Sequence, residues 1–155
     1  MDPVVFTHDP GLGELRRRRA ELRDALGALE QAMAAPAFGR ASAWGGRVQA
    51  ALVELAADLR EHIALTEGPD GLHEDVVANA PRLSNAVARL GREHTALTRL
   101  VADLLRRVDG QPVTDGDVDA VRDLGTILLG ALVRHRQRGA DLVYEAYQAD
   151  LGGET

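Results

Sequence analysis

Three histidines stand on apolar helical stripes where an aliphatic side chain would pack better. They are His62 in "LREHIALTE", His94 in "LGREHTALTRL" and His135 in "LVRHRQRGADLVYEAY". A leucine lies three or four residues before each one, the spacing of a helix face that packs into a bundle interior. A buried imidazole nitrogen without a partner costs about 1–3 kcal/mol. A metal ion would satisfy all three rings, and imidazole suits iron, zinc or copper.

A fourth basic residue, Arg19, interrupts the apolar stripe of the first long segment in the same way. At about 1.5 Å per helical residue, all four basic residues can fall at one depth of an antiparallel bundle. The sequence therefore predicts that Arg19 shares an interior layer with the three histidines. The alternative is structural, since a histidine on an apolar stripe is commonly a core residue hydrogen-bonded to a neighbour.

Helix breakers divide the chain into the segments that must position these residues. Four long segments with short connections predict an all-α protein, an antiparallel up-down-up-down four-helix bundle. Candidate N-caps are Ser42 for the second helix and Thr114 or Asp115 for the fourth, and Pro81 suits the first turn of the third. The expected long helices are 11–35, 42–67, 81–108 and 117–150, with a short helical turn over 72–80.

Length and composition agree with one helical domain. The 155 residues are expected to form a single domain, 1–155, with frayed ends at 1–11 and 151–155. Apolar residues make up 45% of the chain and aromatic residues only 3%, a balance that favours helices over strands. The chain has no cysteine, which excludes disulfides, thiolate metal ligands and cysteine nucleophiles.

The charge pattern narrows the classes of partner. All 18 basic residues are arginine, and the formal net charge is −6, so the basic footprint of a nucleic-acid-binding protein is missing. No apolar run is long enough for a membrane span, and the first residues do not resemble a signal peptide, so we expect a cytoplasmic protein. No glycine-rich phosphate loop or nucleophile–base pair is present, so we do not expect an enzyme.

The same segments, taken in order, resemble the bacterial hemerythrin-like (HHE) domain over residues 12–153. "LREHIALTEG" is similar to that family's second-helix motif, and "LGREHTALTRLVADLL" is similar to its third-helix motif. "LLGALVRHRQRGADLVYEAYQADLGG" resembles its last helix and the ending of an actinobacterial-looking branch. The resemblance implies a four-helix bundle whose histidines and carboxylates hold a non-haem di-iron centre.

Carried over residue by residue, the resemblance implies an incomplete set of ligands. His62, His94 and His135 match histidine ligands of the second, third and fourth helices. Glu67 is the remaining candidate carboxylate, although it lies one residue beyond the matching position. Residues that cannot ligate occupy the other positions, among them Arg19, Thr66, Leu90, Thr98 and Gly139.

The predicted metal site is therefore His62, Glu67, His94 and His135, holding one iron or zinc ion. A full di-iron centre is not expected, because it needs bridging carboxylates and more nitrogen ligands. The resemblance implies binding or sensing of oxygen, nitric oxide, peroxide or iron. The alternative is a metal-free helical bundle that acts as a structural or protein-interaction module, in which Glu67 forms an ion pair with Arg19.

Four further residues receive structural predictions. His73 is expected to be exposed beside "GPDG", and Trp44 to lie in a loop that caps the end of the bundle. Tyr144 and Tyr147 are expected to pack at the end of the last helix and not to ligate iron.

Overall fold

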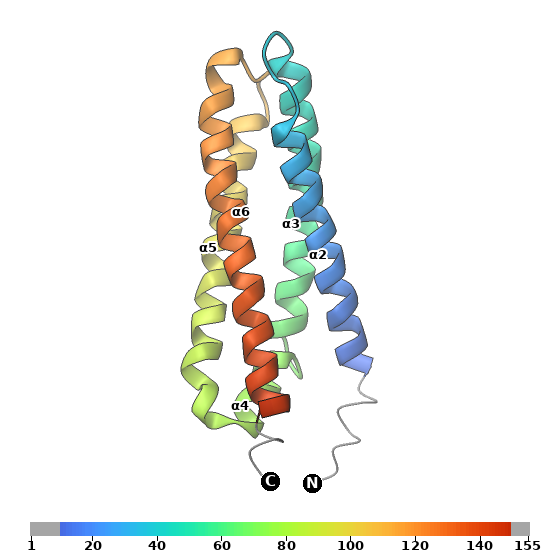
Figure 1. Ribbon diagram of the computed structural model, residues 1–155, viewed down its shortest axis with the longest axis vertical. Coiled ribbons are helices and arrows are strands. Elements are labelled where there is room, and N and C mark those ends of the chain that lie inside the picture. Colours follow the sequence, from blue (N-terminus) through green and yellow to red (C-terminus); the bar gives the residue numbers. More distant parts are fainter. Residues whose placement is uncertain (1–9, 150–155) are drawn as a thin grey trace.

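Four long antiparallel helices form the protein, whose computed structural model describes residues 10–149. Successive long helices run in opposite directions (Figure 1), so the predicted all-α, up-down-up-down bundle is confirmed. The part of the chain that the structure describes contains no strand. The long helices are α2 (Pro10–Ala34), α3 (Ala41–Glu67), α5 (Ser84–Val108) and α6 (Asp115–Val143). The short elements are α4 (Leu72–Asn79), the 3-10 turn η1 (Pro81–Leu83) and the π-helical turn η2 (Tyr144–Ala149).

Two of the three predicted helix starts are confirmed. Thr114 is the N-cap of α6, and its N–H and hydroxyl both donate to the carboxylate of Asp117, at 2.9 and 2.8 Å. Pro81 opens η1, as its fixed φ favours. The Ser42 prediction is wrong, because α3 begins at Ala41 with Arg40 at the N-cap. The frayed ends predicted at 1–11 and 151–155 lie almost wholly outside the described residues.

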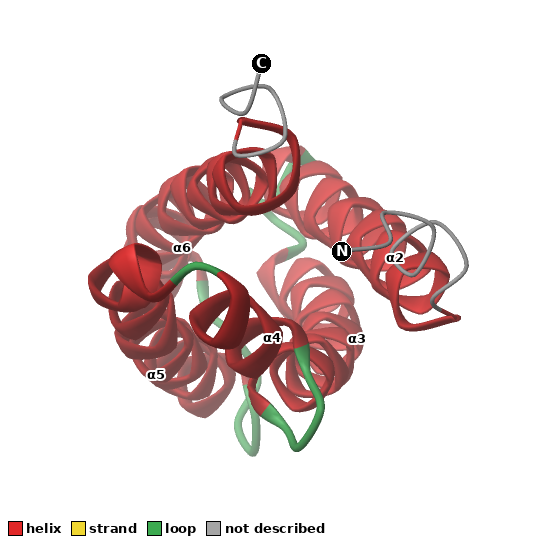
Figure 2. Ribbon diagram, turned by 90° about the horizontal axis from the view of Figure 1, so that it is seen from below, coloured by secondary structure: helices red, strands yellow, loops and turns green. Residues whose placement is uncertain are grey.

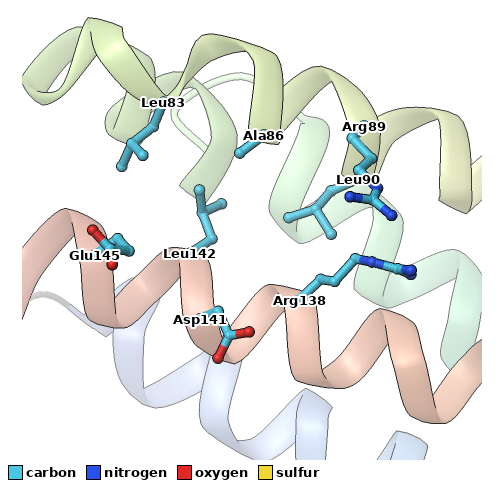
Figure 3. Close-up of a pocket in the computed structure, with 8 residues that line it drawn as sticks. All are labelled: Leu83, Ala86, Arg89, Leu90, Arg138, Asp141, Leu142 and Glu145. Atoms are coloured by element: carbon cyan, nitrogen blue, oxygen red, sulfur yellow. The ribbon is translucent and has the colours of Figure 1, made fainter.

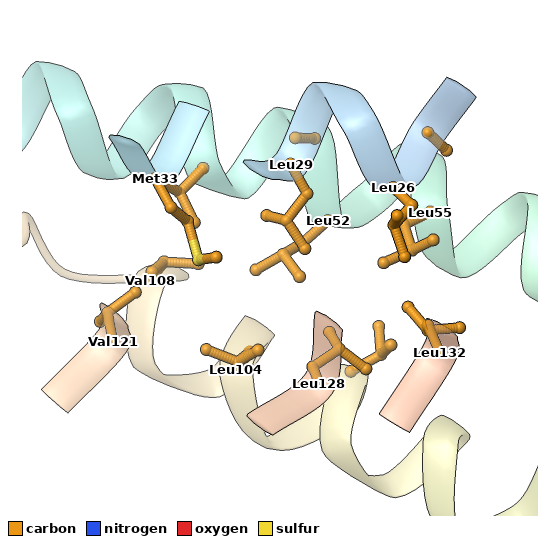
Figure 4. Close-up of a cluster of buried hydrophobic side chains, with 14 of the residues drawn as sticks. Leu26, Leu29, Met33, Leu52, Leu55, Leu104, Val108, Val121, Leu128 and Leu132 are labelled. Carbon is orange, nitrogen blue, oxygen red and sulfur yellow. The ribbon is translucent and has the colours of Figure 1, made fainter. Parts of the chain in front are cut away.

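The main hydrophobic core fills the end of the bundle where α2 joins α3 and α5 joins α6. Leucine, valine and methionine side chains from all four long helices meet there (Figure 4). Trp44 closes this core from within α3 and not from a loop as predicted; only 2% of its surface is exposed. Its indole N–H donates to the Met33 carbonyl at 3.4 Å, and the Arg122 guanidinium lies 5.3 Å from its ring centre.

A second, smaller core lies at the opposite end of the bundle. Val76 of α4, Leu90 of α5 and Leu142 of α6 are buried there. Seen from that end, α4 lies across the opening beside α3 and α5 (Figure 2), and it contacts both helices. Tyr147 packs against this cluster and donates its hydroxyl to Asp75, whereas Tyr144 is mostly exposed. The predicted packing at the end of the last helix is therefore confirmed for Tyr147 and wrong for Tyr144.

Gly45 allows the loop before α6 to approach α3 closely. A Cβ built on Gly45 would lie 2.5 Å from Cγ2 and 2.7 Å from Cβ of Val113. Val113 is a buried, β-branched residue and cannot move aside cheaply. Gly46, the next residue, has no neighbouring atom within 4 Å of such a Cβ.

These two glycines give a matched pair of substitutions. Gly46→Ala should stabilise the protein by up to about 1 kcal/mol, because alanine is the better helix former. Gly45→Ala should destabilise it by about 1–3 kcal/mol, because overpacking exceeds that gain. Urea unfolding of both variants measures the difference. Equal stabilisation by both would contradict the close packing of Val113 against α3.

Within residues 10–149, no helix combines the length and apolar character needed to cross a membrane.

Candidate metal centre

Three histidines from three helices lie together between the two hydrophobic cores. His62 of α3, His94 of α5 and His135 of α6 are 7%, 2% and 4% exposed. Their ring centres lie 5.3 Å (His62–His94), 5.9 Å (His62–His135) and 4.6 Å (His94–His135) apart, all with steep angles between the ring planes. One ring nitrogen from each lies within 4.8 Å of the other two. The three predicted histidines therefore share one interior layer, which we call the histidine layer.

Carboxylates stand behind two of the three rings. Nδ1 of His135 is hydrogen-bonded to Glu93 at 2.8 Å, and Arg138 donates to the other oxygen of that carboxylate at 2.7 Å. Nδ1 of His94 lies 3.0 Å from an oxygen of Glu67, although without the geometry of a hydrogen bond. A carboxylate on the outer nitrogen fixes ring orientation and leaves the inner nitrogen for a metal.

Glu67 therefore lies behind His94 and is absent from the group of three converging ligands. It is more than a third exposed, at 37% of its side chain. Gly91 gives it room, because a Cβ on Gly91 would lie 3.0 Å from the Glu67 carboxylate. The position of Glu67 in the predicted ligand set is consequently better described as support for His94.

Several ring nitrogens in the layer have no hydrogen-bond partner. Within the described chain, Nδ1 of His62 and both nitrogens of His94 are buried without a hydrogen bond. A buried nitrogen without a hydrogen bond is costly, and of these three only Nδ1 of His94 has a carboxylate of the described chain nearby, that of Glu67 at 3.0 Å. Orphaned nitrogens on two facing rings are the expected state of ligands that converge on a shared cation.

Burial keeps these rings neutral. Burial first, and then the charges of His94, His135 and Arg19, lower the pKa of His62 to about 3. Burial, followed by repulsion from His135 and His73, lowers the pKa of His94 to about 3. A neutral imidazole is the form that binds a metal ion. Both rings are therefore ready to ligate at neutral pH without losing a proton.

His73 joins the layer from α4, which the sequence did not predict. Its ring is stacked on that of His94, with centres 5.6 Å apart and planes 4° from parallel. Only 9% of His73 is exposed, so the expectation of an exposed residue is wrong. The reason is that α4 folds back across the end of the bundle and buries this face. His73 does not belong to the group of three converging nitrogens.

Arg19 reaches the layer from α2, but the predicted ion pair with Glu67 is wrong. Its terminal nitrogen lies 4.0 Å from the place that a Cβ on Gly139 would take. Among residues 10–149 no ion pair joins Arg19 to Glu67, whose carboxylate faces His94 on α5. Burial lowers the pKa of Arg19.

A second acidic group lies on the outside of α2 and α3. Glu21, Asp58 and Glu61 have oxygens within 4.8 Å of one another. Arg18 pairs with Glu21 at 3.0 Å and also with Glu61. Burial and the neighbouring carboxylates raise the pKa of Asp58. This group is an ion-pair network on a solvated face.

A cavity of about 220 Å³ opens between α5 and α6 beside the layer. Figure 3 shows leucines on its walls, with Arg89 and Arg138 near one end. None of the three histidines lines the cavity. Arg138 connects it to the layer, because the same side chain donates to Glu93.

Comparison of the chain with known protein families, with characterised proteins and with solved structures finds no match. The function must therefore be argued from the site itself.

Proposed function

We propose that this protein is a metal-binding four-helix bundle of hemerythrin-like type, whose histidine layer holds a single iron or zinc ion. His62, His94 and His135 would ligate the ion, and Glu67 and Glu93 would support His94 and His135. The observation that carries the proposal is the convergence of three buried imidazoles, two of which have buried ring nitrogens without a hydrogen bond. Three histidines with one open position are a typical catalytic or ligand-binding zinc site.

The donor set fits one small divalent ion. Nitrogens bound tetrahedrally at about 2.0–2.1 Å lie about 3.3 Å apart. The nitrogens here lie within 4.8 Å of one another, so binding needs the rings to converge by no more than about 1.5 Å. The converging group contains no carboxylate. Because a dinuclear centre needs bridging carboxylates, the layer supports one ion and not two.

Such an ion supplies a Lewis-acidic position at which a small molecule can bind. The resemblance of the sequence to hemerythrin-like domains suggests a role in binding or sensing oxygen, nitric oxide, peroxide or iron. The chain's own contribution is to orient three buried rings and to exclude water with a hydrophobic core on each side. We propose no catalytic residue.

Arg19 favours a second candidate function. A fixed positive charge beside the layer opposes any cation placed there. A bundle that had lost its metal would keep the fold and act as a structural or protein-interaction module.

Metal titration separates the two candidates. Metal-free protein is titrated with ferrous iron or zinc under anaerobic conditions, and uptake is followed by calorimetry and elemental analysis. The proposal predicts about one ion per chain and a higher melting temperature with metal. No uptake and an unchanged melting curve would favour the metal-free module, and two ions per chain would contradict the single-ion site.

Glu93→Gln should weaken metal binding by about 10–100-fold, because the hydrogen bond to Nδ1 of His135 loses its charge. Arg138→Gln is the matched control, since it removes the other partner of the same carboxylate and leaves that bond in place. We expect a change of at most a few fold for Arg138→Gln. Competition with a chromogenic chelator measures both affinities. Equal losses in the two variants would show that Glu93 acts through general electrostatics and does not orient His135.

A further inference from the structure

Arg19 brings an arginine side chain to the histidine layer from α2. Its helix, α2, carries no histidine between Pro10 and Ala34. The guanidinium lies beside Gly139 of α6, one helical turn beyond His135. This contact places a fixed positive charge about one helical turn from His135.

Within the described part of the chain, no side chain neutralises that charge. Across residues 10–149, Arg19 has no ion pair and donates no hydrogen bond, whereas Arg17 and Arg18 on the same helix both pair with Glu14. The two carboxylates of the layer, Glu67 and Glu93, contact His94 and His135. A guanidinium stays protonated when it is partly buried, and an unpaired buried charge is costly.

Gly139 leaves space next to the guanidinium. Residue 139 has no side chain, and the nearest side-chain atom to a Cβ built there is the Arg19 nitrogen itself, at 4.0 Å. A side chain with a carboxylate at this position would face Arg19. Glycine at this position instead leaves the guanidinium without a facing carboxylate.

We propose that Arg19 makes the histidine layer a binding site for a small monocarboxylate anion, which lies between the guanidinium and the metal ion. The inference rests on the proposed function and names its ligand class. The guanidinium offers paired N–H donors that match the two oxygens of a carboxylate. Imidazole ligands bring no negative charge to the ion, so an anion at the open position would offset the charge of the ion and that of Arg19. A neutral ligand would neutralise neither.

The test uses the full chain loaded with cobalt(II), whose visible spectrum reports its ligands, and formate as the probe. Cobalt uptake by elemental analysis is measured first and tests the proposed function alone. Formate is then titrated against the wild type, Arg19→Gln and Arg16→Gln. Arg16 is an exposed arginine on the same helix and serves as the control.

Arg19→Gln should weaken formate binding by about tenfold or more, the value of a charge-assisted hydrogen bond. The same variant should bind cobalt more tightly, because it removes a repelling charge. Arg16→Gln should change neither affinity appreciably. A purely structural role for Arg19 would not move the two affinities in opposite directions.

A second variant adds a carboxylate of the protein itself, which should compete with formate for Arg19. Gly139→Asp places a carboxylate beside Arg19 and should also weaken formate binding, while Ala140→Asp adds the same charge at an exposed neighbouring site and should not. If cobalt binds and formate affinity is equal in the wild type, Arg19→Gln and Gly139→Asp, the inference is overturned. If cobalt does not bind at all, the proposed function fails and the inference fails with it.

Discussion

Replacing His94 by leucine should abolish most metal binding and at the same time stabilise the metal-free protein. His94 is one of three converging ligands, so its loss should weaken metal affinity by about 100-fold or more. Both of its ring nitrogens are buried without a hydrogen bond, and leucine removes them with little change of shape. Removing unsatisfied polar atoms should raise the free energy of unfolding of the metal-free form by about 1–3 kcal/mol.

Thermal melts with and without zinc measure both effects. The melting temperature of the wild type should rise on adding zinc. His94→Leu should have a higher melting temperature without zinc, and zinc should raise it almost no further. His73→Leu is the control, because it removes an imidazole that stacks on His94 but does not join the converging group. A lower melting temperature for metal-free His94→Leu would contradict the claim that this ring is unsatisfied without metal.

Acid should destabilise the metal-free protein well before its carboxylates titrate. The pKa values of His62 and His94 are lowered from 6.5 to about 3 in the folded protein. The unfolded chain therefore binds more protons between these values, and stability falls as the pH falls below about 6.5. Between pH 6.5 and 5 each histidine should remove about 2 kcal/mol from the free energy of unfolding.

Urea unfolding at pH 7.5, 6.5 and 5.0 in the presence of a chelator checks this dependence. The double variant His62→Leu, His94→Leu should lose most of the slope, because the groups responsible are gone. Zinc should steepen the pH dependence of the free energy of unfolding in the wild type, since protons and metal compete for the same nitrogens. A wild-type slope no greater than that of the double variant would show that these rings are not held neutral by the fold.

The sequence predicted the three central histidines because helical periodicity determines which face each residue occupies. His62, His94 and His135 stand on the same stripes as the core leucines, so burial of those stripes brings the rings together. The offset of Glu67 by one residue was also informative. That rotation of about 100° carries its carboxylate off the stripe, where it lies behind His94.

The features of the site that the sequence did not predict depend on tertiary packing. Glu93 precedes His94 by one residue and faces α6, a contact that requires knowing which helix lies beside α5. The burial of His73 depends on how the "GPDG" turn directs α4 across the end of the bundle. Arg19 was correctly placed at the layer, but its absence of an acidic partner follows from side-chain directions that periodicity does not predict.

X-ray absorption spectroscopy of the zinc-loaded protein tests the central claim most directly. Imidazole ligands give nitrogen scattering at about 2.0–2.1 Å with a characteristic outer-shell pattern from the ring atoms. We predict three imidazoles and one further oxygen or nitrogen ligand on a single zinc ion per chain. His135→Leu should show one imidazole fewer. A first shell made of oxygen without imidazole scattering would contradict the claim that the histidine layer is a metal site.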